Sequence, residues 1–287
     1  MRWQGSRRSS NVEDRRASGG AGMSMGALLP LIRFLLGSNI GRVVLAVGVA
    51  AYFMGFNPLA LLEPSSAPTQ QNLNSPKERE KVEFVSAVLA ETESVWSKIF
   101  SEHGARYKEP SLVLFRNSVS SKCGFASSQT GPFYCPADEK VYLDLGFFEE
   151  LASKHKARGD FAQAYVIAHE IGHHVQNITG TLGKIHNLKA KSRDLSKQNA
   201  LQVKVELQAD CYAGIWAHYM QKYQILEDGD IEEALNAASA IGDDTLQKKY
   251  QGHVVPDSFT HGSSKQRMQW FKKGFEGGKL SSCAFEI

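Results

Sequence analysis

The stretch AYVIAHEIGHHVQN places His169, Glu170 and His173 within an otherwise apolar sequence. Residues four apart lie on one face of a helix, so both imidazoles can reach a single ion, and Glu170 lies about 60° around the helix from His173. Two neutral imidazole nitrogens, a third protein ligand and a water are the usual coordination of catalytic zinc. A bound Zn²⁺ lowers the pKa of its water towards neutrality, and a neighbouring glutamate can take that proton and pass it on. The pattern therefore predicts a zinc site that activates water.

Burial gives a second reason to expect an ion there. Unpaired polar groups in a buried helix cost several kcal/mol, so two histidines and a glutamate need something to satisfy them. His174 points about 100° away from His173, too far to share the ion, and is interpreted as a packing or surface histidine. A metal on His169 and His173 is the simplest solution.

A third ligand is expected in VELQADCYAGIWAHY, where Glu206 and Asp210 are four residues apart. One carboxylate can bind the metal while the other accepts the free ring N–H of a ligating histidine and fixes its tautomer. Spacing alone leaves open which carboxylate has which role. A solvated acidic stripe is the alternative, but the apolar neighbours of both residues indicate a mostly buried helix.

Strands followed by helices predict an α+β fold around these motifs. PSLVLFRN and EKVYLDL have the β-branched and apolar residues of strands, and the CGFASSQTGPFYCP sequence between them resembles a hairpin. Helices are expected from residue 77 to about 102, 147–156, 160–178, 194–223 and 231–241, with a terminal helix after THGSSKQR. The hairpin around residues 125–134 is the candidate edge that binds extended peptide.

Four cysteines form an even set that allows three pairings. The favoured pairs are Cys123 with Cys135, which closes a short loop, and Cys211 with Cys283, which ties the C-terminal tail to a helix. Four free buried thiols are the alternative. Disulfides persist outside the cytoplasm, so the favoured pairing predicts an exported domain.

Charge is unevenly distributed along the 287 residues, whose net charge is +3. Before Glu63 there are seven arginines against Glu13 and Asp14, a surplus of five positive charges, so the rest of the chain carries −2. A nearly neutral body argues against a nucleic-acid-binding protein.

An uncharged apolar run, VVLAVGVAAYFMGFNPLALL, is long enough to cross a bilayer as a helix. The expected organisation is a disordered basic cytoplasmic arm (1–39), a transmembrane helix (40–62), a linker (63–76) and a zinc peptidase domain (77–287). Because arginines precede the run, the positive-inside rule predicts a single-pass protein of the bacterial inner membrane with a cytoplasmic N-terminus and a periplasmic or extracellular catalytic domain. The alternative is a cytoplasmic enzyme without a span.

The two motifs, the CGFASSQTGPFYCPADEKVYLDL segment, HGSSKQR and the MRWQGSRRSSNVEDRR start together resemble the bacterial family described as putative neutral zinc metallopeptidases. H-E-x-x-H followed by E-x-x-x-D on a second helix is also similar, more distantly, to gluzincin-like membrane proteases. The resemblance implies a mostly helical zincin-like (minigluzincin-like) metalloprotease domain with a small sheet or hairpin, one Zn²⁺ per chain, and a peptide or protein substrate.

The same resemblance implies roles for individual residues. Glu206 corresponds to the zinc-binding glutamate and Asp210 to its supporting partner. His261 is a candidate to stabilise the oxyanion of the tetrahedral intermediate, although Gly262 stands where those proteases carry proline. The alternative is that His261 is a structural histidine in a loop. Arg267 is a candidate to orient Asp210 or the substrate, or to hold the terminal helix through an ion pair.

Two functional hypotheses follow from these residues. The first is a membrane-anchored zinc peptidase in which Glu170 is the general base and then the acid. The second is a non-hydrolytic, zinc-stabilised envelope interaction protein whose ion is structural. The intact Glu170 favours the first, because a structural zinc site does not need it.

Overall fold

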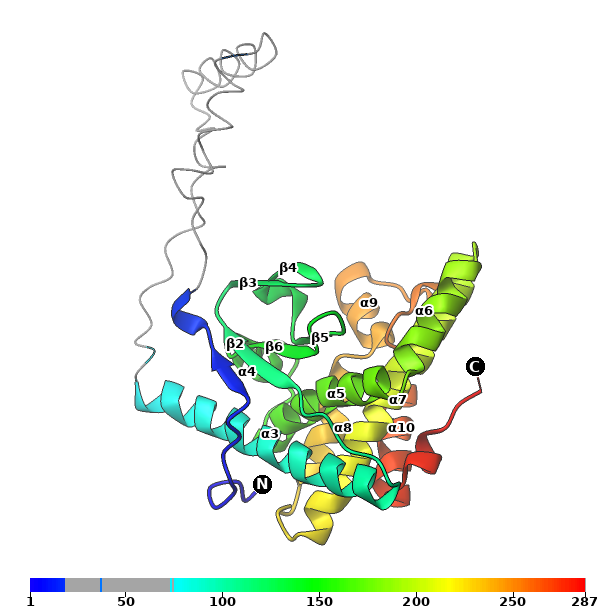
Figure 1. The fold of residues 1–287 in the computed structure, drawn as a ribbon. Coiled ribbons are helices and arrows are strands. Elements are labelled where there is room, and N and C mark those ends of the chain that lie inside the picture. The colour runs from blue at the N-terminus through cyan, green and yellow to red at the C-terminus, as the bar shows by residue number, and fades with distance from the viewer. Residues whose placement is uncertain (19–36, 38–72, 74, 287) are drawn as a thin grey trace.

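The protein is described by a computed structural model that covers residues 1–18, 37, 73 and 75–286. This part of the chain is mostly helical with two small sheets, which confirms the α+β class (Figure 1). The strands are β1 (Val12–Asp14), β2 (Ser111–Phe115), β3 (Ser118–Ser121), β4 (Gly124–Ser127), β5 (Phe133–Cys135) and β6 (Lys140–Asp144). Four of them form a sheet in the order β1-β2-β6-β5, in which only β5 runs antiparallel to its neighbour.

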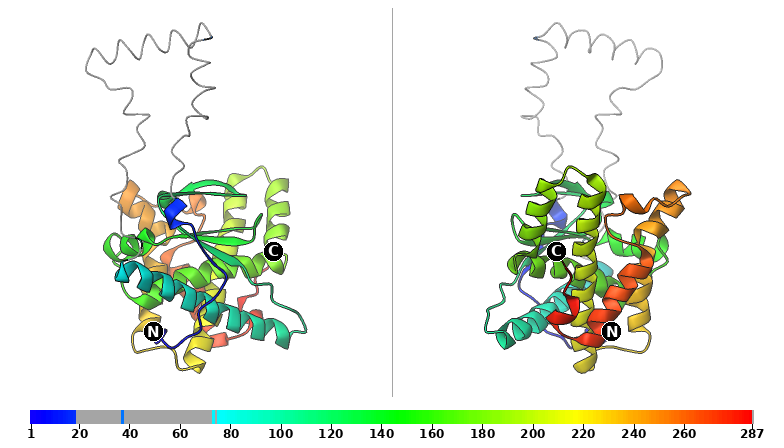
Figure 2. Two further views of the ribbon diagram at one scale, coloured as in Figure 1. Left: turned by 60° about the vertical axis from the view of Figure 1, so that its left-hand side comes forward. Right: turned by 90° about the vertical axis from the view of Figure 1, so that its right-hand side faces the viewer.

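Helices cover one side of this sheet and form the rest of the body (Figures 1 and 2). They are α3 (Pro76–Glu102), α4 (Gly146–Ser153), α5 (Asp160–Ile178), α6 (Thr181–Lys191), α7 (Leu195–Lys222), α8 (Asp230–Ala240), α9 (Asp243–Gln251) and α10 (Ser264–Gly277). Capping residues set two of the starts, since the side chain of Ser75 accepts from the amide of Glu78, and that of Asp194 accepts from the amide of Lys197. The predicted helices are present, and α6 and α9 are additional.

Small residues let α5, α7 and α10 approach closely. A Cβ atom on Gly172 of α5 would lie 3.0 Å from the carbonyl oxygen of Ala209 on α7. On the other side of α7, a Cβ atom on Gly274 of α10 would lie 1.9 Å from the carbonyl oxygen of Cys211. These contacts bring the two motif-bearing helices together and place α10 beside them.

The predicted hairpin between the first two cysteines is wrong in its pairing. β4 pairs with β3, and together they form a separate two-stranded sheet. β5 instead pairs with β6 at the edge of the larger sheet. The apolar pattern identifies both strands but cannot choose their partners, because strand pairing depends on packing against the rest of the sheet and not on the sequence of one strand.

The expectation of a disordered arm is wrong for residues 1–18. β1 pairs in parallel with β2, and the side chains of Met1 and Trp3 are buried against the core. Trp3 packs edge-on against Phe84 of α3, with ring centroids 5.5 Å apart. The low apolar content of this segment suggests disorder, but its few large apolar side chains pack against the core.

The α-amino group of Met1 gives a pH-dependent contribution to stability. Burial disfavours its charged form, but hydrogen bonds to Asp160 and Glu227 outweigh this and raise its pKa from 8.0 to about 10. A raised pKa stabilises the fold fully below pH 8, and this contribution is lost as the pH rises through about 10. We expect a loss of about 1 kcal/mol, because Asp160 and Glu227 remain partly exposed. Thermal unfolding from neutral to alkaline pH measures it, and the alkaline loss should be smaller in Asp230→Asn, which removes another carboxylate near the amine.

Both disulfides of the favoured pairing are present, Cys123–Cys135 and Cys211–Cys283, with 12 and 72 residues of separation. In the chain-entropy account, loops of these lengths contribute about 3 and about 4 kcal/mol. We therefore expect Cys211→Ala/Cys283→Ala to lower the free energy of unfolding more than Cys123→Ala/Cys135→Ala does. Denaturant titration of the two double variants tests the order, and an equal or reversed loss would contradict it.

The predicted transmembrane helix, residues 40–62, lies outside the described residues, as does most of the predicted linker. Among the ranges that the structure describes, no helix has both the length and the apolar character needed to cross a membrane.

Candidate active site

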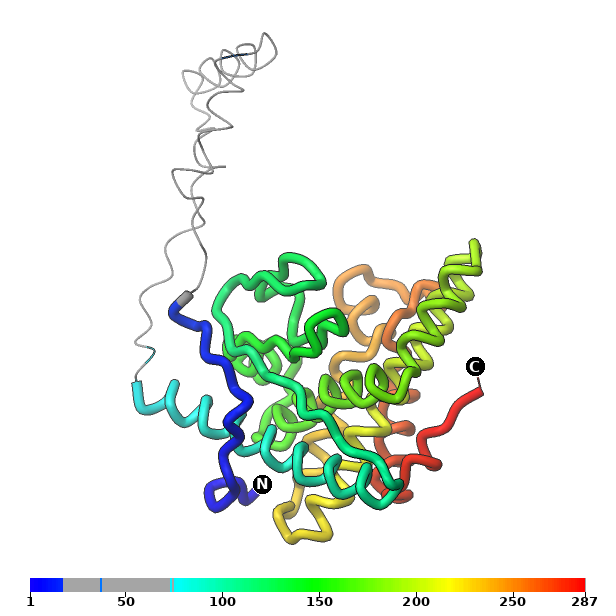
Figure 3. The backbone as a smooth tube through the Cα atoms, viewed as in Figure 1, coloured from blue at the N-terminus to red at the C-terminus, as the bar shows by residue number. Residues whose placement is uncertain are grey.

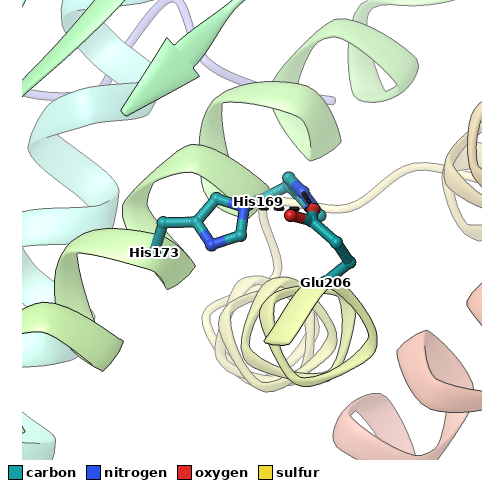
Figure 4. Close-up of side chains that lie close together, drawn as sticks. All are labelled: His169, His173 and Glu206. Atoms are coloured by element: carbon teal, nitrogen blue, oxygen red, sulfur yellow. Dashed lines mark hydrogen bonds and ion pairs between the residues drawn. The ribbon is translucent and has the colours of Figure 1, made fainter. Parts of the chain in front are cut away.

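His169 and His173 on α5 and Glu206 on α7 point toward one another where the two helices cross (Figure 4). The Nε2 atoms of His169 and His173 lie 3.3 and 3.2 Å from the same carboxylate oxygen of Glu206. One ligand atom from each residue lies within 4.8 Å of the other two. The structure thus brings together the three residues that the sequence analysis assigns to the metal.

Hydrogen bonds to the outer ring nitrogens fix how both imidazoles face the centre. His169 donates from Nδ1 to Oδ1 of Asp210 (2.8 Å), and His173 donates from Nδ1 to the amide oxygen of Gln176 (2.9 Å). Since neutral imidazole carries one ring proton, each Nε2 keeps a free lone pair for a metal. Gln202 donates to the other oxygen of Glu206 (2.8 Å) and orients that carboxylate.

The electrostatics of the centre favour a positive charge. Burial disfavours charge on all three side chains, but the carboxylates of Asp210 and Glu206 outweigh it and raise the pKa of His169 to about 10. Against the same burial, Glu206 also raises the pKa of His173, and the two imidazoles hold the pKa of Glu206 well below its ordinary value. A metal cation can take the place of the protons that the raised pKa values favour on the two imidazoles.

The donor set therefore fits zinc. Two Nε2 atoms and one carboxylate oxygen are a three-ligand set of the kind that catalytic zinc sites use, with a fourth position left for water or substrate. The supporting hydrogen bonds to His169 and His173 are those expected around ligating histidines.

Glu170 lies on the wall of a cleft of about 550 Å³ that also exposes the three ligands. Apolar side chains line much of this cleft, namely Phe133, Phe147, Val166, Leu182, Ile185, Val205, Ile241 and Leu246, and its other polar members are Thr130, His186, Lys189, Gln202, His261 and Arg267. A concave site that combines apolar walls with convergent polar groups is typical of a binding site for an organic ligand. Glu170 thus lines the same cleft as His169, His173 and Glu206 without belonging to the cluster that could hold the metal.

Asp210 is fully buried behind the cluster of His169, His173 and Glu206. The guanidinium of Arg267 on α10 pairs with both of its carboxylate oxygens. The guanidinium donates from Nε to Oδ2 and from Nη2 to Oδ1 of Asp210, each at 2.9 Å. Burial opposes ionisation, yet Arg267 and His169 lower the pKa of Asp210 to about 2. Arg267 also donates to the carbonyl oxygen of Ile241. The ion pair that the sequence analysis considers for Arg267 is thus present, and its contacts tie α10 to α7 and to the end of α8.

His261 lines the same cleft from the loop before α10, with its side chain about half exposed. Oδ2 of Asp243 accepts from the backbone amides of Thr260, His261 and Gly262 at 2.6–3.0 Å, which fixes this loop. Gly262 has a φ of +91°, which proline cannot adopt because its ring holds φ near −65°. The loop therefore differs in conformation from the His-Pro pattern of the gluzincin-like proteases.

The edge strand β5 is attached to α5 by a buried histidine. His174 lies 3.0 Å from the hydroxyl of Tyr134 through Nδ1 and 2.6 Å from the carbonyl oxygen of Lys108 through Nε2. Asn177 also donates to the Tyr134 hydroxyl. His174 thus packs behind the site, as predicted, and holds the strand that forms one wall of the cleft.

Several residues that support the metal-site cluster are not predicted from the sequence. Tyr165 donates to Asp210 (2.5 Å) and accepts from Arg267, and Gln176 orients His173. Helical spacing could have identified both, since Tyr165 precedes His169 by four residues and Gln176 follows His173 by three. Asp243 leaves no such signal, because its partners lie in a loop 17 to 19 residues away.

Comparisons with known proteins agree with this chemistry. The sequence model of the family described as "Putative neutral zinc metallopeptidase" matches residues 1–285. Uncharacterized protein YpfJ of Escherichia coli strain K12 is 49% identical over 285 residues, which cover 99% of this chain and 98% of YpfJ. Uncharacterized protein Rv2575 of Mycobacterium tuberculosis strain H37Rv is 42% identical over 190 residues, 62% of each chain. No solved structure matches significantly.

Proposed function

Because this chain belongs to the family of putative neutral zinc metallopeptidases, we propose that it is a zinc-dependent peptidase with Glu170 as its general base. One observation carries the proposal. The Nε2 atoms of two imidazoles converge on one carboxylate of a second helix, and an additional glutamate stands beside them on the cleft wall.

His169, His173 and Glu206 would hold the ion. When bound there, zinc lowers the pKa of a coordinated water to about 7 and polarises a substrate carbonyl. Asp210 and Gln176 keep the two imidazoles in the tautomer that leaves Nε2 free. A rigid ligand set of this kind needs no rearrangement before substrate enters.

Glu170 accepts the proton of the attacking water and returns it to the leaving amine. His261 is assigned as a donor to the developing oxyanion. Nδ1 of His261 lies 3.0 Å from the Thr260 hydroxyl and 3.4 Å from Oδ1 of Asp243, and in the tautomer in which the hydroxyl donates to Nδ1, Nε2 carries the ring proton. A proton at Nε2 can then be donated to negative charge in the cleft.

Extended peptide is the substrate class that the cleft supports. β5 is the last strand of its sheet, and Phe133 and Tyr134 on it line the cleft. A peptide can add to such an edge through backbone hydrogen bonds, while its side chains enter the apolar walls. Within the candidate peptide-binding edge, residues 125–134, we therefore assign the role to β5.

We further propose that the protein contacts the membrane through its apolar run, residues 43–62. An uncharged apolar run of this kind is more stable in the hydrocarbon region of a bilayer than in water. This part of the proposal rests on the sequence alone.

Digestion of a peptide library by the purified full chain tests the proposed activity. We expect cleavage that stops when a chelator removes the metal and returns when Zn²⁺ is restored, as mass spectrometry of the products would show. Cleavage that persists in metal-free protein would contradict zinc dependence. Stably bound zinc without any turnover would instead favour the alternative, a non-hydrolytic interaction protein.

A further inference from the structure

Residues 1–18 are an integral part of the domain formed by residues 75–286. Figure 3 shows this segment, in blue, crossing α3, and its strand β1 lies beside β2. Val12, Glu13 and Asp14 of β1 pair with residues 112, 113 and 114 of β2, respectively. The amide of Arg15 donates to the carbonyl oxygen of Leu114 (2.8 Å). The segment therefore completes one edge of the sheet that lies over the site.

A buried carboxylate on α3 depends on this segment. Glu93 is 1% exposed, and it accepts from Arg7 (2.6 Å), Ser9 (2.5 Å) and Asn11 (2.8 Å). A buried charge whose partners are removed costs several kcal/mol. Residues 7–11 supply all three of these partners, so burial of Glu93 and docking of the segment go together.

A second charged contact lies at the other end of the segment. Arg16 is buried and donates to Glu78 at the start of α3 (3.0 Å), and Arg116, which follows β2, donates to the same carboxylate oxygen (2.6 Å). Arg16 also forms a two-pronged pair with Asp14 of β1. The segment is thus held immediately before residue 19, where the described part of the chain is interrupted.

The first residue reaches the base of the helix that carries the metal ligands. The amine of Met1 lies 2.7 Å from Asp160, which begins α5, and 3.3 Å from Asp230, which begins α8. The amide of Arg2 donates to the carbonyl oxygen of Ile225 (2.8 Å). Contacts with α3, α5, α8 and β2 mean that the segment cannot dock unless the folded domain is present beside it.

We infer that residues 1–18 and residues 75–286 lie on the same side of the membrane. Residues 18 and 75 must therefore lie in one compartment, because a bilayer about 30 Å thick cannot separate paired strands. This inference replaces the predicted single-pass topology, in which a cytoplasmic N-terminus is separated from an exported domain. It holds whether or not the site hydrolyses peptides.

Thiol labelling of full-length protein in intact bacterial cells tests the inference. Gln4→Cys reports on the segment and Leu195→Cys on the domain, since both side chains are exposed, the latter by 68%. A membrane-impermeant maleimide is applied before and after lysis, and mass spectrometry locates the labelled residue. We expect the two cysteines to react at the same stage. Reaction of one in intact cells and of the other only after lysis would overturn the inference.

A measurement on the unmodified chain keeps the inference testable if either variant folds poorly. The amides of Ser9 and Arg15 donate to the carbonyl oxygens of Ser86 and Leu114. We expect hydrogen exchange at both amides to be slowed by at least about 100-fold relative to an unstructured peptide, as for amides of stable strands. Exchange at the unstructured rate would show that the segment is undocked and would remove the basis of the inference.

Discussion

Replacement of Glu170 by glutamine should lower the rate of peptide-bond hydrolysis by about 100- to 10,000-fold, the range that a positioned general base contributes. The amide has nearly the shape of the carboxylate but cannot accept a proton from water at neutral pH. Because the proposed ligands are His169, His173 and Glu206, the zinc content should stay unchanged. Peptide cleavage rates and elemental analysis of the same samples measure the two quantities.

A matched substitution separates the chemistry from a general effect on the fold. Glu232→Gln makes the same change on the exposed surface of α8 and should leave the cleavage rate unaltered. Cleavage by Glu170→Gln at the rate of the unmodified protein would refute the assigned base. Loss of zinc together with activity would mean instead that Glu170 supports the metal, and the proposed mechanism would have to change.

The parts of the site that the sequence predicts are those fixed by helical spacing. The expected bounds of α5, residues 160–178, agree with the structure, because its apolar sequence runs without interruption from the turn at Gly159. His169 and His173 share a face for the same reason. The meeting of α5 with α7 is a tertiary contact, made possible by Gly172 against Ala209, and spacing within one helix cannot predict it.

The parts that the sequence does not predict depend on partners distant in the chain. β1 is three residues long and rich in charge, so its strand conformation comes from pairing with β2 rather than from its own preference. α6 has a single fully buried residue, Ile185, and its weak apolar pattern looks like a loop. Both elements nevertheless matter to the site, since α6 forms one wall of the cleft and β1 extends the sheet above it.

Replacement of Asp210 by asparagine should have the largest effect on stability, together with a loss of metal affinity. The carboxylate accepts from His169, from Tyr165 and twice from Arg267, whose guanidinium is 2% exposed. An asparagine side chain keeps one acceptor oxygen and leaves the Arg267 charge without a counter-charge. Breaking a buried ion pair in this way costs about 3–5 kcal/mol.

The same substitution should weaken zinc binding by about 10- to 100-fold, the usual effect of removing the partner of a ligating histidine. The neutral amide oxygen of asparagine is a weaker acceptor for Nδ1 of His169 than a carboxylate, so it holds the tautomer that leaves Nε2 free less firmly and makes the imidazole a weaker ligand. Denaturant titration and zinc competition with a chromophoric chelator measure the two effects. The matched change Asp257→Asn, on the exposed loop before His261, should alter neither.

A double variant separates the two roles of Asp210. In Asp210→Asn/Arg267→Met the unpaired buried charge is absent, so part of the lost unfolding free energy should return. Zinc affinity should stay low, because nothing in that variant restores the negative charge of the acceptor at Nδ1 of His169. If removal of Arg267 restored zinc affinity as well, the weakened binding would be a consequence of the unpaired charge, and Asp210 would not act by orienting His169. If Asp210→Asn bound zinc as tightly as the unmodified chain, the supporting role of Asp210 in the metal site would be refuted outright.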